Sequence, residues 1–128
     1  MNWNYSGTGK TRIVSKVTLD KNEFYFFDSI FIENSYVKDN NFILKDRKLW
    51  CIDGNSIEFY HFRNGIYEKI FKFLFSKNKF VLKEEYFCNP DIYSGDIQIF
   101  DYGISFSITI IGKRKNELIE YTYYVDNY

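Results

Sequence analysis

Apolar and polar residues alternate along most of this chain with a period of two. The clearest case is residues 104–111, ISFSITII, where apolar side chains at every second position alternate with serine or threonine. In residues 67–75, YEKIFKFLF, the same spacing places Tyr67, Lys69 and the following phenylalanines on one face. Because successive side chains of a strand point to opposite faces, this spacing predicts half-buried β-strands rather than helices.

Short clusters of turn-forming residues separate the alternating runs. Asp53-Gly54 and Asn64-Gly65 are strong hairpin signals, because both dipeptides tolerate a positive φ angle. Asp39-Asn40-Asn41 is read as a further turn. The runs between such signals predict nine strands, at about residues 9–19, 23–33, 42–53, 56–63, 66–76, 79–87, 93–101, 104–113 and 117–125.

The short connections predict the fold class. Neighbouring runs are joined by too few residues for crossover connections, which favours an antiparallel meander. A meander of this length tends to curl until its edges meet. We therefore expect an all-β chain with a single domain over residues 1–128, folded as an antiparallel up-and-down barrel of about 8–10 strands.

Charge and aromatic content narrow the classes of function. The 17 basic and 17 acidic residues balance, whereas a general nucleic-acid binder or an electrostatic membrane anchor carries a basic excess. Aromatic residues make up 22% of the chain, and such large rings fill a core or line a binding surface. We expect no nucleic-acid or membrane partner, and a monomer or homodimer.

The cysteines and the N-terminus bear on location. Cys51 and Cys88 lie far apart and form no paired motif, which suits a reducing compartment better than a disulfide scaffold. No basic segment followed by an apolar stretch marks a signal peptide, and no apolar run is long enough for a membrane-spanning helix. The expected location is the cytoplasm.

One short stretch, Gly9-Lys10-Thr11, resembles the end of a phosphate-binding loop. That motif requires a glycine five residues earlier, where this chain has Asn4, and a helix directly afterwards. The residues that follow, RIVSKVTL, are typical of a strand. We therefore interpret the glycines as a hinge that leads into the first strand.

Several segments together resemble one protein family. They are Ser6-Gly7-Thr8-Gly9, Arg47-Lys48-Leu49-Trp50, Phe62-Arg63-Asn64-Gly65, Cys88-Asn89-Pro90-Asp91-Ile92-Tyr93 and Gly112-Lys113-Arg114-Lys115-Asn116. In order and spacing, these segments resemble an uncharacterised domain-of-unknown-function family of small β-barrel proteins. The resemblance covers nearly the whole chain and implies a calycin-like, lipocalin-like barrel. Tyr86 stands where that family has a histidine, and Lys113 where it has a proline.

Candidate chemistry is sparse. His61 is the sole histidine, so a metal site would lack the ligands it needs, and neither a metal nor a cofactor is expected. A nucleophilic pair of Cys88 or Cys51 with His61 is conceivable. Asp91 and Tyr93 lie two residues apart, so they share one side of an extended segment and could orient a ligand or transfer a proton. They equally suit a turn cap and a packed ring.

The arginines are the remaining candidates. Arg12 and Arg47 fall within predicted strands, and Arg114 falls in the last hairpin turn. Inside a small barrel an arginine requires a carboxylate or a ligand anion as its partner. The candidate ligand-binding residues are Arg12, Arg47, Trp50, Cys88, Asp91, Tyr93, Arg114 and Tyr121.

Three classes of function remain open. The leading hypothesis is a non-enzymatic barrel that binds a small, partly apolar and possibly anionic molecule. The alternatives are an enzyme of the isomerase, lyase or hydrolase type, which would use Cys88 with His61 or Asp91 with Tyr93, and a protein-interaction module with an aromatic outer face.

Overall fold

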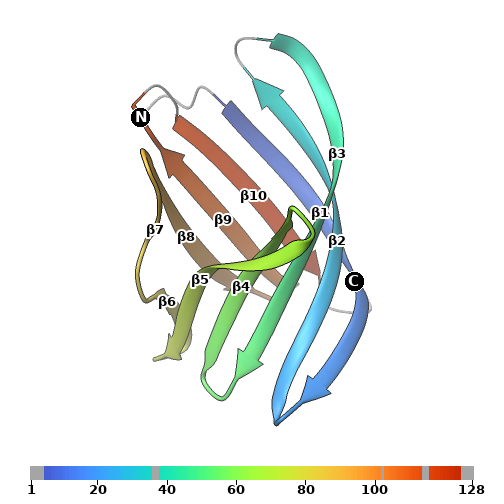
Figure 1. Cartoon of the computed structure of the whole chain (residues 1–128), viewed down its shortest axis with the longest axis vertical. Coiled ribbons are helices and arrows are strands. Elements are labelled where there is room, and N and C mark those ends of the chain that lie inside the picture. Colours follow the sequence, from blue (N-terminus) through green and yellow to red (C-terminus); the bar gives the residue numbers. More distant parts are fainter. Residues whose placement is uncertain (1–4, 36–37, 102, 114–115, 125–128) are drawn as a thin grey trace.

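The chain folds as β-strands joined by tight turns (Figure 1). The computed structural model describes residues 5–35, 38–101, 103–113 and 116–124. In these ranges the strands are β1 (Tyr5–Leu19), β2 (Asn22–Ser35), β3 (Lys38–Asp53), β4 (Ser56–Arg63), β5 (Ile66–Ser76), β6 (Lys79–Leu82), β7 (Tyr86–Cys88), β8 (Asp91–Phe100), β9 (Gly103–Ile111) and β10 (Asn116–Tyr124). The predicted all-β class is confirmed. The described part contains no helix long and apolar enough to cross a membrane.

Two predicted details of the strands are wrong. The turn expected at Asp39-Asn40-Asn41 lies inside β3, because β2 continues to Ser35, which pairs with Lys38. Pairing along this long hairpin outweighs the turn preference of asparagine. The single strand expected over residues 79–87 is divided into β6 and β7, and residues 83–85 between them are not part of a strand.

All ten strands belong to one sheet, in the order β6-β5-β4-β3-β2-β1-β10-β9-β8-β7. The expected antiparallel meander is present, except that β1 and β10 pair in parallel. The direction of the chain explains this exception. β6 and β7 run the same way as two pieces of one strand, so the chain makes nine passes, and an odd number leaves the first and last passes parallel.

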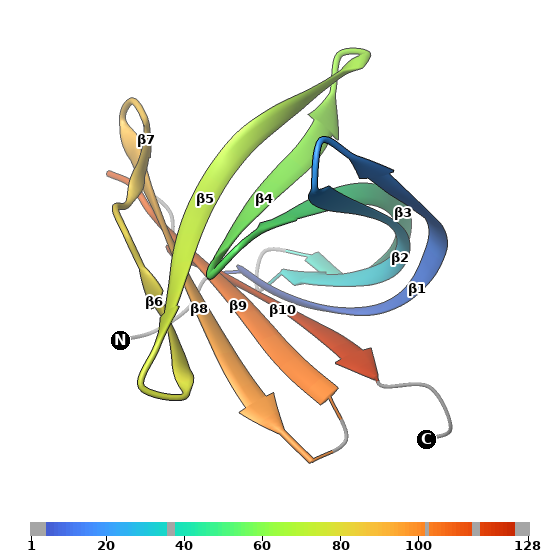
Figure 2. The ribbon, with the colours of Figure 1, turned by 90° about the horizontal axis from the view of Figure 1, so that it is seen from below.

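The sheet curls strongly about its interior, and β6 comes close to β8 (Figure 2). β6 and β7 are nevertheless the two edges of the sheet, and no backbone ladder joins the two edges in the described residues. The observed architecture is therefore a curled antiparallel sheet without a complete ring of hydrogen bonds.

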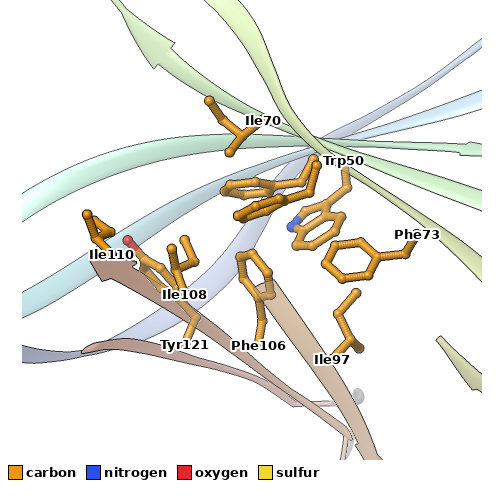
Figure 3. Packing of buried hydrophobic residues seen from close by; sticks show 10 residues of the cluster. Trp50, Ile70, Phe73, Ile97, Phe106, Ile108, Ile110 and Tyr121 are labelled. Atoms are coloured by element: carbon orange, nitrogen blue, oxygen red, sulfur yellow. The ribbon is translucent and has the colours of Figure 1, made fainter. Parts of the chain in front are cut away.

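Aromatic rings fill the middle of the interior. Four phenylalanines are almost completely buried, namely Phe59, Phe71, Phe73 and Phe106. The indole of Trp50 lies among them, with ring centroids 4.7 Å from Phe59 and 5.0 Å from Phe106 (Figure 3). The high aromatic content of the chain therefore serves a packed core at this level.

Gly95 in β8 lets two of these rings reach the opposite wall. A Cβ atom at this position would lie 2.9 Å from Cε2 of Phe71 and 3.1 Å from Cζ of Phe73. Both rings belong to β5, which is not a hydrogen-bonded neighbour of β8. Packing of rings against bare backbone thus holds the curled sheet together where no ladder does.

Candidate functional site

The inward side chains change in character from one end of the interior to the other. Along β3 the inward positions are Ile52, Trp50 and Lys48. The neighbouring strand β4 repeats this order with Ile57, Phe59 and His61, each directly across from its partner. The interior therefore has an apolar end, an aromatic middle and a polar end.

The apolar end contains a cavity of about 250 Å³, which we call the apolar cavity. It lies at the end of the molecule where the β3–β4 and β5–β6 turns are found, at the bottom of Figure 1. The lining residues come from seven strands: Tyr25, Phe27, Trp50, Ile52, Ile57, Phe80, Ile97, Gly103, Ile104 and Tyr123. Among the described residues, no charged side chain belongs to this lining.

Polar side-chain atoms of the lining form hydrogen bonds with protein groups. The indole Nε1–H of Trp50 donates to the hydroxyl of Tyr123 at 2.9 Å. The hydroxyl of Tyr25 donates to Glu23 at 2.6 Å. The surface that faces the cavity is therefore composed of rings and aliphatic side chains, with hydroxyl groups at its margins.

A second hollow of about 370 Å³ continues from the apolar cavity toward solvent. The two share Ile52, Ile57, Phe80 and Ile104 in their linings. Apolar side chains form most of this outer part, where Phe75 is 40% and Ile99 is 51% exposed, and Asn55 and Ser56 at the β3–β4 turn complete it. The cavity thus has an apolar entrance at the turn end of the sheet.

The polar end of the interior holds a compact group of side chains, which we call the polar cluster: Lys48, His61, Glu68 and Tyr86. Lys48 is only 6% exposed, and its Nζ lies 5.5 Å from the ring centroid of Phe59 and 5.2 Å from that of Tyr121. His61 Nε2 lies 3.4 Å from Oε2 of Glu68, and the hydroxyl of Tyr86 donates to Oε1 of the same carboxylate.

The surroundings of the polar cluster shift three pKa values. Burial lowers the pKa of His61, an effect that Lys48 reinforces and the hydrogen bond to Glu68 opposes. The hydrogen bond from Tyr86, followed by that from His61, lowers the pKa of Glu68. The hydrogen bond between Tyr86 and Glu68, together with burial, raises the pKa of Tyr86 to about 12. Near neutral pH the cluster therefore combines a neutral imidazole, a carboxylate and a protonated phenol.

A β-bulge creates this cluster. β4 and β5 pair regularly up to Phe59 opposite Phe71, but Tyr60 lies opposite Lys69, so Ile70 is an extra residue on β5. Beyond the bulge Glu68 shares the inner face with His61. The sequence had predicted Lys69 on the face of Phe71, which is wrong. Lys69 is half-exposed and forms an ion pair with Glu58, 3.0 Å away.

The predicted ligand residues fall in different places. Trp50 lines the apolar cavity, and Tyr121 is buried in the adjoining core beside Lys48. Tyr93 faces the polar end, with its ring centroid 5.6 Å from that of Tyr86. Cys88 and Asp91 lie opposite each other at the β7–β8 turn, so the structure brings neither to the cavity.

The structure describes the side chain of one of the three candidate arginines. Arg47 is exposed on the outer face, where its Nε lies 3.3 Å from Oδ1 of Asp28. The backbone of Arg12 pairs with Asp28 in β1–β2, and its side chain is outside the described part of the structure. Arg114 also lies outside the described residues. Of the three arginines, the described structure thus places only the side chain of Arg47, which lies away from the apolar cavity.

The structure also places His61 relative to the two cysteines, Cys51 and Cys88. His61 contacts Glu68, and no hydrogen bond links it to Cys51 or Cys88 in the described part. Cys51 is buried on the outer side of β3, and burial raises the pKa of its thiol. The described residues contain no group of three potential metal-binding side chains.

Comparisons of this chain with protein-family models, with curated proteins and with solved structures found no match.

Proposed function

We propose that the protein binds a small, neutral and largely apolar molecule in the apolar cavity. The observation that carries this proposal is the aromatic and aliphatic lining of that cavity, which has an entrance at the turn end of the sheet. Binding sites for small molecules are usually concave, mostly apolar and supplied with a few placed polar groups. Here the hydrogen-bonded pair of Trp50 and Tyr123 is the polar element.

The size of the cavity bounds the ligand. An apolar cavity of about 150 Å³ in a protein interior stays dry and accepts benzene. The present cavity of about 250 Å³ therefore suits a bicyclic ring or a short branched chain, with any remaining part of the ligand in the outer hollow. The described lining contains no charged residue, which favours a neutral molecule over an anion, because a buried charge without a partner is costly.

We further propose that the curled sheet is a calycin-like barrel and that the protein is cytoplasmic. Curling, the nine passes of the chain and a ligand cavity at one end support the first proposal. Two free cysteines, Cys51 and Cys88, support a reducing compartment.

Titration with the neutral fluorophore N-phenyl-1-naphthylamine tests the binding site. We expect its fluorescence to rise on binding to the wild-type protein, because the dye leaves water for an apolar surface. The substitution Ile104→Trp fills the cavity and should weaken binding at least about tenfold, equivalent to about 1.4 kcal/mol. Native mass spectrometry of protein from its own host should reveal a retained small molecule.

The matched control is Ile66→Trp, which adds the same side chain at a position that is 63% exposed and outside the cavity lining. This variant should bind the dye like the wild type. Equal binding by both variants would place the dye elsewhere. A clean unliganded mass together with no dye binding by the wild type would contradict the proposal.

A further inference from the structure

The open side of the sheet has an unusual origin. β6 pairs with β5, whereas β7, the next piece of the same pass, pairs with β8. The last backbone bond before the exchange runs from the amide of Lys83 to the carbonyl of Lys72, at 2.9 Å. Beyond this bond the two walls separate, as β5 and β7 do in Figures 1 and 2.

We call the region between these walls the seam. On one side, residues 66–71 of β5 have β4 as their only strand partner in the described structure. On the other side, β8 is the only strand that pairs with β7 among the described residues. Two strand edges therefore face the same gap, each with main-chain groups that point toward it.

A groove of about 530 Å³ occupies the seam. Its walls are two continuous runs of chain, residues 69–72 and residues 83–87. Such continuous runs expose main chain as well as side chains. Toward the interior the groove is lined by Ile70, Phe71 and the ring of Tyr86, whose hydroxyl belongs to the polar cluster. Toward solvent it carries two lysines on β5, and the opposite wall carries Lys83, two glutamates and the exposed ring of Phe87. One side-chain bond crosses the seam on its inner side, from Tyr86 to Glu68.

From this arrangement we infer that the seam binds an extended segment of another polypeptide, which pairs antiparallel with residues 66–71 of β5. A strand is the occupant that supplies hydrogen bonds to a strand edge in register. Alternate side chains of the segment face inward and are apolar, matching Ile70 and Phe71. The outward side chains are polar and uncharged, because Lys72 on one wall and Glu84 on the other oppose either charge.

The break at residues 83–85 indicates that the seam stays open for another segment and is not closed by pairing of this part of the chain with β5. Lys83, Glu84 and Glu85 place three consecutive charged side chains at the position where the strand leaves β5. Consecutive charges on an edge disfavour pairing of that edge with β5 because at least one would face the apolar interior. The chain thus keeps the seam open by its own sequence.

The test uses a fluorescently labelled, capped hexapeptide that alternates threonine and valine. We expect saturable binding to the full chain, with amide hydrogen exchange slowed in residues 66–71 and unchanged in β3. A second hexapeptide, N-methylated on the amides of one edge, has the same side chains but cannot donate along that edge. Its affinity should fall at least about tenfold.

With peptide present, three outcomes would overturn the inference. They are no binding of either peptide, equal binding of both, or exchange protection outside the seam. Protection of residues 66–71 that increases with protein concentration in the absence of peptide would instead identify a second copy of this chain as the occupant, and would also overturn it. None of these outcomes depends on the apolar cavity, so the two proposals fail separately.

Discussion

At the scale of single residues, two contacts between strands that are not hydrogen-bonded neighbours help to hold the curled sheet together. Gly95 allows the rings of Phe71 and Phe73 to rest on the backbone of β8. The hydroxyl of Tyr86 reaches Glu68 from the other side of the seam. Neither contact belongs to the backbone ladder, so each depends on which residue types occupy the positions involved.

Gly95→Ala should destabilise the fold by about 1–3 kcal/mol, because its Cβ atom would overlap two rings that are each 1% exposed. Urea unfolding measures this change in free energy. Gln98→Ala, at an exposed position of the same strand, is the control and should change stability by less than about 0.5 kcal/mol. Equal stability of the Gly95 variant and the wild type would mean that β5 and β8 do not pack this closely.

At the scale of elements, the tight turns determine which strands pair. Asp53-Gly54 and Asn64-Gly65 form hairpin turns where the sequence predicted them, with positive φ angles at Gly54, Asn64 and Gly65. The β5–β6 turn also requires positive φ angles at its two central residues, but these are a lysine and an asparagine. Lys77 and Asn78 have φ angles of 53° and 63°, in a region that a lysine side chain disfavours.

Transfer of the better dipeptide to the poorer turn tests this account. The double substitution Lys77→Asn with Asn78→Gly should stabilise the protein by about 1 kcal/mol, because Asn-Gly adopts two positive φ angles at lower cost. The thermal unfolding midpoint should rise accordingly. The reverse experiment, Gly65→Ala at a φ of 80°, should lower it. A lower midpoint for the double variant would contradict the proposed strain at Lys77.

At the scale of the whole molecule, the interior is divided between an apolar and a polar end. The polar end makes stability depend on pH. The groups that face His61 are Lys48 from β3, Glu68 from β5 and Arg63 from its own strand. A histidine whose pKa is lower in the folded than in the unfolded state stabilises the fold above its ordinary pKa of about 6.5. That contribution is lost as the pH falls through the folded-state pKa.

The free energy of unfolding should therefore decrease between about pH 7.5 and about pH 5.5, since the unfolded state binds the proton first. Urea unfolding at both pH values measures the difference, and His61→Gln should reduce it. Glu68 adds a second loss at lower pH, because its pKa is also lowered. An identical pH dependence in the wild type and the His61 variant would exclude this role for His61.

Much of the fold could be predicted from local sequence. Strands β4 and β5 have the expected bounds. The two hairpin turns predicted at Asp53-Gly54 and Asn64-Gly65 are present, each with a positive φ angle. Alternation also placed Phe106 and Ile108 inside and Ser107 on the opposite face. These features depend on residues that are neighbours in the chain, so they can be recognised without knowledge of the fold.

Much less of the candidate site could be predicted. Of the proposed ligand residues, Trp50 lines the apolar cavity, whereas Phe80 and Ile97 of the same lining were not singled out. Nothing local distinguishes these two from other strand residues. Glu68 was missed for a different reason: the bulge at Ile70 reverses the faces of β5, and no periodic pattern predicts one extra residue.

The sequence by itself determined the β class, the turns and an aromatic core, because period-two alternation and turn chemistry act over a few residues. Only the tertiary structure decided the parallel pairing of β1 with β10, the gradient from apolar to polar interior and the seam between β5 and β7. The gradient and the seam arise where strands distant in sequence approach one another, and the parallel pair depends on how many passes the whole chain makes. The physical reason is that a cavity or an open edge is a property of several strands together, whereas alternation is a property of each strand alone.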